Sequence, residues 1–515
     1  MTPKIITRRN FLYIGAGTVA GTVLGYGCES SPSLSSKPKV SGPSKSGSTI
    51  RDYSFHASKF TGAPDGRERM LMGFNEMFPG PMIRATEGDT IRVRLKNDLG
   101  TPTTTHWHGQ FQEGTWFMDG VSGVTQQPIP NGTDFVYEFT ANPSGTFWYH
   151  SHAGVQYGNG YKGPLIVDEK DPIATYDRDE VLMISDWFLE QTTEILQHVK
   201  SGKYDDDNSS KMPKMRTGKM KMKMDVADVP WQSGLMNGKG RMDPYNGKEP
   251  LTTFNVEKGE TIRLRLLNTS STYSFQIRID GHPMTVIAAD SVPVKPMEVD
   301  TLRIDIGQRY DVLVRANLPG VHWIRAMTRN GKEFLGVLKY KGTAASEPSA
   351  KSGQWGPRNL NELDLRNKAP VDLRGVTYRE IPFVLGGTMN PYRWNVNGQT
   401  YPEIEPIRIK QGEVIRFIMK NPTGMWHPFH LHGQTFHVLG KPGNLNLVNP
   451  LTRDTVMLKS QETTVIQHQF NNPGRWFFHC HIMWHLAVGM ATILEVHPFH
   501  DPRGKAYLDS LIGRG

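Results

Sequence analysis

The stretch Gly-Asp-Thr-Ile-Arg-Val-Arg-Leu-Lys-Asn, residues 88–97, decides how this chain is organised, because it occurs three times. It returns as Gly-Glu-Thr-Ile-Arg-Leu-Arg-Leu-Leu-Asn at 259–268 and as Gly-Glu-Val-Ile-Arg-Phe-Ile-Met-Lys-Asn at 412–421. Each copy is typical of a turn followed by a strand with alternating apolar and polar residues. The copies begin 171 and 153 residues apart. This repeat predicts three β-sandwich domains of one type.

A second repeat follows each copy of the first. Gly-Thr-Phe-Trp-Tyr-His-Ser-His at 145–152 matches Gly-Arg-Trp-Phe-Phe-His-Cys-His at 474–481. The middle unit has Gly-Val-His-Trp-Ile-Arg-Ala-Met at 320–327, in which arginine, alanine and methionine replace the last three residues. We therefore expect a middle domain that has lost metal ligands and separates the other two.

Length and composition agree with this organisation. At roughly 150 residues per domain, 515 residues correspond to three domains. The 52 glycines and 35 prolines favour turn-rich all-β structure over helical bundles. The net charge of +9 is not gathered into a basic patch dense enough for nucleic acid, so we expect a soluble basic protein that binds none. The two cysteines, Cys28 and Cys480, cannot form a disulfide framework.

The first 27 residues are typical of an export signal. Arg8 and Arg9 precede a mildly apolar, glycine-rich run, the pattern read by the bacterial twin-arginine export machinery. A non-cleaved anchor or a disordered arm is the alternative. Cys28 follows the run, but the residues before it match a lipoprotein signal imperfectly, so lipidation and simple cleavage both stay open. Residues 28–49 have the composition of a disordered linker, and we expect a periplasmic or cell-surface protein.

Ten of the 18 histidines gather in four short segments. These segments are His106-Trp107-His108, His150-Ser151-His152, His427-Pro428-Phe429-His430-Leu431-His432, and His479-Cys480-His481 with the nearby His485. On a strand, the two imidazoles of a His-X-His pair point to one face. One such pair can be a coincidence of packing, but four pairs at matching repeat positions indicate metal binding.

The third domain contains the residue types of a blue-copper site. His427, Cys480 and His485, with Met490, supply two imidazoles, a thiolate and a thioether. This set is typical of an electron-transfer copper with a weak axial methionine. Zinc also accepts cysteine and histidine, but it has no redox chemistry. The eight other histidines are too many for one ion, and they suit a cluster of three coppers shared by the first and third domains.

Cys480 explains why the two sites occur together. Its sulfur faces one copper, while its neighbours His479 and His481 point the other way along the strand. That alternation joins the two sites by a few covalent bonds, which provides a short path for electrons. Ser151 occupies the equivalent position in the first domain and cannot bind in this way, so we expect the one-electron site in the third domain alone.

With these motifs, the chain resembles the three-domain multicopper oxidases: laccases, ascorbate oxidases and bacterial copper-resistance oxidases. The likeness extends from about residue 50 to 500. It implies cupredoxin-like Greek-key β-sandwiches and four copper ions, which couple one-electron oxidation of a donor to the reduction of dioxygen to water. By this resemblance, the type 1 copper is held by His427, Cys480, His485 and Met490. The type 2 copper is held by His106 and His430, and the type 3 pair by His108, His150, His152, His432, His479 and His481.

The resemblance and the repeats together give the domain boundaries. We expect cupredoxin domains at residues 50–170, 171–345 and 373–500. A polar linker at 346–372 precedes the third domain, and a tail at 501–515 follows it.

Two further positions bear on proton delivery. Asp119, in Met118-Asp119-Gly120, matches an acid that the family places near the cluster to deliver protons, and otherwise it is an ordinary turn aspartate. Related enzymes often carry an acid three residues after the copper-binding cysteine, but this chain has Met483 there. Proton delivery is therefore expected to depend more on Asp119 or on water.

The electron donor stays open between a phenolic or other aromatic compound and Cu(I). Residues 211–224 contain five methionines, and thioethers select Cu(I). The lysines between them repel a cation, however, so a solvated basic loop on the middle domain is the alternative. Fe(II) oxidation and non-catalytic copper binding in copper resistance are other candidates. A copper carrier would not need eight further histidines, and a copper nitrite reductase usually has two-domain subunits without type 3 ligands.

Overall fold

The structure is a computed structural model, which describes residues 49–201, 229–329, 331–349, 353 and 355–511. The predicted export signal, Cys28 and the methionine-rich segment 211–224 lie outside these residues. What the sequence predicts for them therefore stays a prediction.

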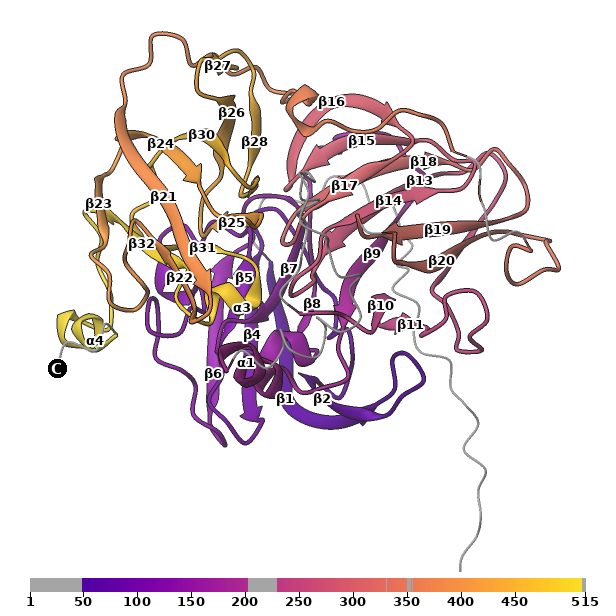
Figure 1. The fold of residues 1–515 in the computed structure, drawn as a ribbon, viewed down its shortest axis with the longest axis horizontal. Coiled ribbons are helices and arrows are strands. Elements are labelled where there is room, and N and C mark those ends of the chain that lie inside the picture. Colours follow the sequence, from indigo (N-terminus) through magenta and orange to yellow (C-terminus); the bar gives the residue numbers. More distant parts are fainter. Residues whose placement is uncertain (1–48, 202–228, 330, 350–352, 354, 512–515) are drawn as a thin grey trace, which may run out of the picture. The chain divides into compact units, whose positions relative to one another are not determined.

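The three copies of the repeat form equivalent strands, namely β4 (Thr90–Asp98), β13 (Thr261–Asn268) and β24 (Val414–Asn421) (Figure 1). In β4, buried side chains alternate with more exposed ones, as the pattern predicts. The middle copy, β13, is buried along nearly its whole length. The reason is that the arginines alternating with its apolar residues are themselves buried in ion pairs.

Two four-stranded sheets form the first domain. Their strand orders are β2-β1-β4-β6 and β3-β8-β7-β5. Besides β4, the strands are β1 (Ile50–Gly62), β2 (Arg69–Phe74), β3 (Ile83–Thr86), β5 (Thr105–His108), β6 (Asp134–Thr140), β7 (Gly145–Ser151) and β8 (Lys162–Asp168). Apolar and aromatic side chains from both sheets, such as Val93 and Tyr149, form the core between them.

The middle domain consists of a seven-stranded sheet, β11-β10-β9-β13-β18-β15-β16, and a five-stranded sheet, β12-β20-β19-β14-β17. Besides β13, the strands are β9 (Arg178–Trp187), β10 (Ser233–Met236), β11 (Lys239–Gly240), β12 (Thr253–Val256), β14 (Phe275–Ile279), β15 (Met284–Ala289), β16 (Val292–Val299), β17 (Leu302–Ile304), β18 (Arg309–Arg315), β19 (Val321–Met327) and β20 (Glu333–Tyr340).

The third domain again has two sheets. One follows the order β22-β21-β24-β30-β26-β27, with β28 also paired to β26, and the other follows β23-β32-β31-β25-β29. Besides β24, the strands are β21 (Arg379–Met389), β22 (Tyr392–Val396), β23 (Ile407–Lys410), β25 (His427–Leu431), β26 (Phe436–Lys441), β27 (Asn444–Leu445), β28 (Leu451–Arg453), β29 (Thr455–Leu458), β30 (Glu462–Gln469), β31 (Gly474–Cys480) and β32 (Ala491–His497).

The pairing of strands is the same in all three domains. Each repeated strand is parallel to an early strand of its domain, in the pairs β1–β4, β9–β13 and β21–β24. On its other side it is antiparallel to β6, β18 or β30. The second repeat forms β7, β19 and β31, which pair with β5, β14 and β25. The prediction of an all-β chain built from one repeated sandwich is confirmed.

Helices are few and short among the residues that the structure describes. They are α1 (Thr192–Lys200), α3 (Met483–Leu486) and α4 (Lys505–Ser510), with 3-10 turns η1 (Trp116–Met118), η2 (Gln156–Asn159) and η3 (Glu362–Asp364). In the part of the chain that the structure describes, no helix is long and apolar enough to cross a bilayer. The segment before the third domain carries η3 and pairs with the middle domain through Val294 and Asn367.

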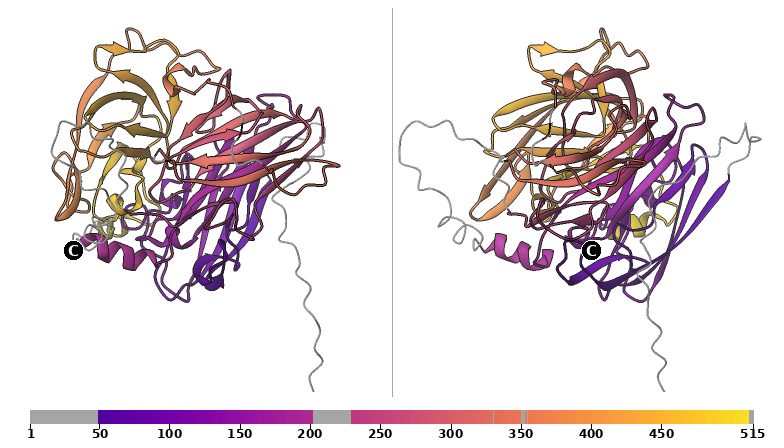
Figure 2. Two further views of the ribbon diagram at one scale, coloured as in Figure 1. Left: turned by 45° about the vertical axis from the view of Figure 1, so that its right-hand side comes forward. Right: turned by 90° about the vertical axis from the view of Figure 1, so that its right-hand side faces the viewer.

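The strands that carry histidines in the first and third domains lie next to one another. Figure 1 shows β5 and β7 beside β25 and β31, and in both views of Figure 2 the violet strands of the first domain lie against the yellow strands of the third. Ring contacts such as His106 on His432, with centroids 3.8 Å apart, join the two groups of strands. The fold therefore brings together segments more than 300 residues apart in the sequence.

Candidate metal centre

A cysteine and two histidines of the third domain converge at one buried point. His427 begins β25, Cys480 ends β31 and His485 lies in α3. The Nδ1 atoms of the two histidines are 3.0 Å apart, and they lie 3.7 Å and 3.6 Å from the sulfur of Cys480. All three side chains are completely buried. Two imidazoles and a thiolate arranged in this way fit a trigonal copper site.

Met490 is tied to the same site through its backbone. Its N–H donates to the carbonyl oxygen of His485 at 3.0 Å, and its own carbonyl accepts from the N–H of Cys480 at 3.0 Å. Its side chain is fully buried. The turn after α3 therefore holds Met490 next to Cys480 and His485, where its thioether would be a further ligand of the copper that they bind.

Neighbouring groups fix the orientation of these histidines. The hydroxyl of Thr423 lies 2.8 Å from Nε2 of His427, so Nδ1 faces the sulfur. The ring of Trp394 packs on His485, with centroids 4.3 Å apart, and on His427, with centroids 5.1 Å apart. A hydrogen bond to the outer nitrogen and an apolar wall commonly orient the ligands of a metal.

The remaining eight histidines form one buried group between the first and third domains. Two sets of three bring their nitrogen atoms within 4.8 Å of one another, namely His108 with His150 and His481, and His152 with His432 and His479. In the first set, Nδ1 of His108 lies 3.3 Å from Nε2 of His481. In the second, Nε2 of His479 lies 3.0 Å from that of His432 and 3.4 Å from that of His152. Each set would hold one type 3 copper.

His106 and His430 lie beside these two sets. The ring of His430 stacks on His108, with centroids 3.7 Å apart. The Nε2 atoms of His106, His150 and His430 are buried, and they have no hydrogen-bond partner among the described residues. Buried polar atoms without partners are costly in a folded protein. Bound metal would satisfy them, so this group of side chains fits a copper cluster.

Burial favours the neutral form of eight histidines in the two sites. It lowers the pKa of eight histidines below the usual value, and neighbouring histidines lower most of them further. These residues are His108, His150, His152, His427, His430, His432, His479 and His481. A neutral imidazole presents the lone pair that a metal requires, so the site suits metal binding near neutral pH.

Asp119 lies against the cluster. Its carboxylate is 2.8 Å from Nδ1 of His432 and 3.2 Å from Nδ1 of His106. Asp119 is buried and follows η1, and Gly120 after it has φ +83°. A Cβ atom on Gly120 would come within 1.8 Å of the carbonyl oxygen of Thr105, so only glycine fits there. This turn holds one carboxylate against a histidine from each of the two outer domains.

Asp454 is a residue that sequence reasoning missed. Its carboxylate lies 3.5 Å from Nδ1 of His430 and 3.6 Å from Nε2 of His108. Arg309 binds both oxygens of that carboxylate, at 2.7 Å and 2.6 Å. Burial alone would raise the pKa of Asp454, but Arg309 and the two histidines hold it well below its usual range. No local signal marks Asp454 because its partners come from three domains.

Met483 stands where related enzymes often carry an acid. It is buried at the start of α3, and its N–H donates to the carbonyl oxygen of Ser271 at 2.9 Å. Close by, the hydroxyl of Tyr157 lies 3.4 Å from the carbonyl oxygen of His481. The side chain of Met483 reaches Gly158 of the first domain, so on this side of the cluster an apolar group stands where related enzymes often carry an acid.

Comparisons with known proteins agree with this geometry. Family models described as multicopper oxidase match residues 56–172, 178–343 and 377–500. The chain is 32% identical to "Multicopper oxidase MmcO" of Mycobacterium tuberculosis, covering 95% of this chain and 96% of that protein. It is 34% identical to "Laccase-1" of Fomitopsis schrenkii, covering 85% of each.

A solved structure shows the same fold. The laccase of Botrytis aclada superposes with a TM-score of 0.77 at 30% identity, covering 90% of this chain and 92% of the laccase. The sheets described above are therefore those of cupredoxin-like multicopper oxidases, and type 1, type 2 and type 3 coppers are the cofactors of this group. With three matching family models and relatives above 30% identity over most of its length, the chain belongs to the multicopper oxidase family.

Proposed function

We propose that this multicopper oxidase takes electrons one at a time from an aromatic donor such as a phenol and uses four of them to reduce dioxygen to water. The observation that carries the proposal is the position of Cys480. Its sulfur faces His427 and His485, while His479 and His481 on either side belong to the other group of histidines. One peptide unit on each side of Cys480 therefore links the one-electron site to the larger cluster through a continuous covalent path.

The protein would bind, orient and shield these centres. When bound, copper supplies the redox chemistry, one electron at the type 1 site and the four-electron reduction of dioxygen at the cluster. Asp119 orients His106 and His432, and Asp454 does the same for His108 and His430. Complete burial of most of these side chains excludes bulk water from the path between the centres.

An aromatic donor is favoured over a metal ion by the surroundings of the type 1 site. Aromatic rings, including Trp394, pack beside its histidines. Among the described residues, every group of three His, Cys, Asp or Glu side chains close enough to hold a metal lies in the two centres themselves. Several relatives carry the name laccase, which supports the same choice.

Oxidation of Cu(I) is the second candidate. The five methionines at residues 211–224 support it, since thioethers are soft ligands for Cu(I). Within the described residues, no group of potential metal ligands outside the two centres favours oxidation of Fe(II).

The experiment is a side-by-side measurement of kcat/KM for a phenol, Cu(I) and Fe(II) with the copper-loaded enzyme. We expect the phenol to be oxidised with four electrons consumed per dioxygen and without release of hydrogen peroxide. A kcat/KM for Cu(I) far above that for any phenol would replace this proposal with cuprous oxidation. Replacing the five methionines together should then weaken Cu(I) oxidation and spare the phenol.

We also propose export to the periplasm or cell surface, on the strength of Arg8 and Arg9 before the apolar run. A lipid on Cys28 would anchor the mature protein to a membrane. Cell fractionation tests this, because Cys28→Ala should then release the protein. Mass spectrometry that finds a mature N-terminus beyond Cys28 would contradict lipidation.

A further inference from the structure

An indole ring lies against the histidines of one type 3 set. Trp148 in β7 stacks on His150, with ring centroids 4.2 Å apart and an angle of 29° between the rings. The indole centroid also lies 5.1 Å from the ring of His108 and 5.5 Å from that of His481. Trp148 is completely buried. A side chain that can be oxidised therefore lies beside all three histidines that would bind one copper of the cluster.

A buried tyrosine lies next to this indole. The ring of Tyr157 lies 6.2 Å from that of Trp148 and 5.1 Å from that of His150. The hydroxyl of Tyr157 donates to the carbonyl oxygen of His481 at 3.4 Å. Aromatic rings at such centroid distances are in contact, and electrons pass readily between rings in contact. Trp148 and Tyr157 therefore form one oxidisable pair beside the cluster.

The other type 3 set meets a phenyl ring instead. Phe477 occupies in β31 the position that Trp148 has in β7, two residues before a cluster histidine. Its ring centroid lies 5.5, 5.9 and 5.1 Å from those of His152, His432 and His479. A phenyl ring is much harder to oxidise than an indole or a phenol. The two sets thus have rings at equivalent places, but only the ring of the first set gives up an electron readily.

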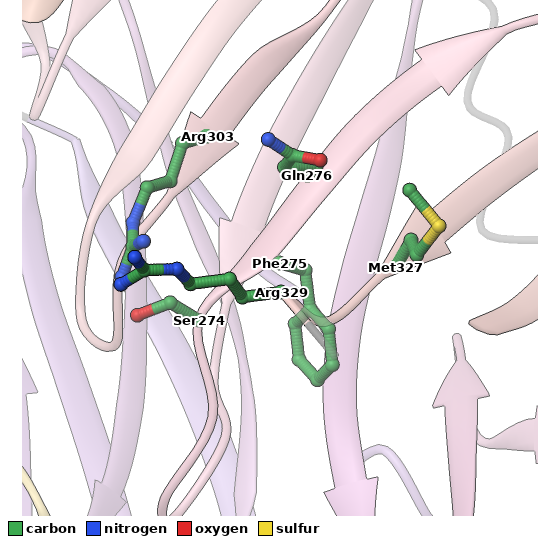
Figure 3. A pocket seen from close by; sticks show the side chains of 6 residues that line it. All are labelled: Ser274, Phe275, Gln276, Arg303, Met327 and Arg329. Carbon is green, nitrogen blue, oxygen red and sulfur yellow. The ribbon is translucent and has the colours of Figure 1, made fainter. Parts of the chain in front are cut away.

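The same strand position in the middle domain holds an indole without a metal centre. Trp323 in β19 is equivalent to Trp148, and it packs on Tyr245, with ring centroids 6.0 Å apart, and on apolar side chains. Met327 stands where the outer domains have a cluster histidine, and its side chain lines a small cavity (Figure 3). Tryptophan at this position therefore suits a sandwich core in general. What is particular to Trp148 is the contact with three metal-binding histidines.

Hydrogen bonding decides where an oxidised pair would hold its radical. The indole N–H of Trp148 is buried and has no hydrogen-bond partner among the described residues. Without an acceptor, an oxidised Trp148 keeps its proton and stays a strong oxidant, so it takes an electron from Tyr157. The hydroxyl of Tyr157 does have an acceptor, on the backbone of a cluster ligand. Oxidation of the pair therefore ends at Tyr157, with loss of the hydroxyl proton.

We propose that Trp148 and Tyr157 are an auxiliary one-electron donor to the cluster, used when the type 1 site cannot deliver its electron. The inference rests on the proposed reduction of dioxygen, which takes four electrons, whereas the cluster alone holds three when its coppers are bound. Tyr157 gives the missing electron, its O–H bond breaks, and the proton goes to the oxygen that becomes water. The next donor electron and a proton from water restore the tyrosine. The pair thereby protects the histidines from incompletely reduced dioxygen.

Electron paramagnetic resonance detects the radical directly. The copper-loaded variant Cys480→Ser lacks the type 1 site, so its chemically reduced cluster meets dioxygen one electron short. After rapid freezing we expect a radical signal that narrows when ring-deuterated tyrosine is incorporated, and adding Tyr157→Phe should abolish it. The control is Tyr401→Phe, which alters a tyrosine packed on Phe477, with centroids 5.0 Å apart, and should leave the signal unchanged. The absence of a radical, or a tyrosyl signal that persists in Tyr157→Phe, would overturn the inference.

A second measurement uses the enzyme with its type 1 site intact. With dioxygen in excess and donor scarce, Tyr157→Phe should accumulate oxidised histidines at positions 108, 150 and 481 faster than Tyr401→Phe, as mass spectrometry of the peptides would show. Equal histidine oxidation in the two variants would refute the protective role.

The radical experiment also separates this inference from the proposed function, because a chemical reductant replaces the natural donor. A tyrosyl radical at Tyr157 in an enzyme that oxidises no phenol would refute the aromatic donor alone. Phenol oxidation by an enzyme that forms no radical in the Cys480→Ser variant would refute the auxiliary donor alone.

Discussion

At the scale of single residues, one side-chain atom distinguishes the first domain from the third, namely the oxygen of Ser151 in place of the sulfur of Cys480. Ser151 and Cys480 occupy equivalent positions between two cluster histidines. The hydroxyl of Ser151 donates to Gln156 at 2.7 Å, whereas the sulfur of Cys480 faces His427 and His485. A thiolate is a strong ligand for copper and a serine hydroxyl is not, so only the third domain can build the one-electron site.

Replacing Cys480 with serine should therefore remove the blue colour and all oxidase activity. Blue colour arises from charge transfer between thiolate and copper, which serine cannot provide. Visible absorption and oxygen consumption measure the two effects. The matched control is His150→Gln, which lies in the cluster and should keep the colour while losing oxygen reduction. A Cys480→Ser protein that stayed blue would refute the type 1 assignment.

Replacing Met490 with leucine should raise the reduction potential of the type 1 site. A thioether donates weakly to copper, and its loss favours the cuprous state. Leucine has a similar volume, so the buried site should keep its packing. Redox titration followed at the blue band gives the potential. No change, or a fall, would show that the sulfur of Met490 is not an axial ligand.

At the scale of elements, the asparagine that ends each copy of the repeat makes the same pattern of hydrogen bonds in all three domains. Asn97, Asn268 and Asn421 are completely buried at the ends of β4, β13 and β24. Each side-chain amide donates to two backbone carbonyls, and each side-chain oxygen accepts from the N–H two residues ahead. The asparagine thus closes the loop that leads to the next strand, which carries histidines in the first and third domains.

Asn421→Ala and Asn268→Ala should both lower the stability of the fold, but only Asn421→Ala should alter the type 1 site. Asn268→Ala removes three hydrogen bonds and Asn421→Ala removes four, and each change should cost about 2–4 kcal/mol. Asn421 holds the loop with Thr423, whose hydroxyl contacts His427, so only this change should shift the blue absorption band. Thermal unfolding and visible spectra of the two variants measure the difference. A shifted band in Asn268→Ala would contradict this local account.

At the scale of the whole molecule, the middle domain supports the cluster even though none of its described residues belongs to a group that could hold a metal. Arg309 in β18 donates to the backbone carbonyl of Thr146 in the first domain at 2.9 Å. The same guanidinium binds Asp454 of the third domain, which contacts His108 and His430. The domain expected to be a spacer thus contributes a buried cation that holds the other two together.

Arg309→Met should reduce the copper content of the cluster more than that of the type 1 site. It leaves the buried carboxylate of Asp454 unpaired, which costs about 3–5 kcal/mol and misplaces two histidines. Arg263→Met is the control, since Arg263 pairs with Asp311 and Glu169 in an equally buried site. Metal analysis and the blue band should show about four coppers per chain in the control and fewer in Arg309→Met. Equal copper loss in both variants would mean that only general stability matters.

Short stretches of the sequence determined the repeated strands of this protein and the residue types of its copper sites. The alternation in residues 88–97, 259–268 and 412–421 predicted the repeated sandwich, because a strand with one buried face requires period two. The same period places the imidazoles of each His-X-His pair on one face, so the residue types for copper could be read directly. The likeness to multicopper oxidases then followed from motifs that lie within single strands.

Only the tertiary structure decided which histidines meet. Each set of three draws on both outer domains, and the register of β5 on β7 and of β25 on β31 brings their nitrogens together. Asp454 and Arg309 had no signal in the sequence, since the ion pair that joins them spans 145 residues of the chain. The guanidinium groups of Arg303 and Arg329 likewise reach the ring of Trp426 from positions more than 90 residues away in the chain. Spacing along a chain reports contacts within a strand or turn, whereas contacts between domains depend on packing that no short pattern encodes.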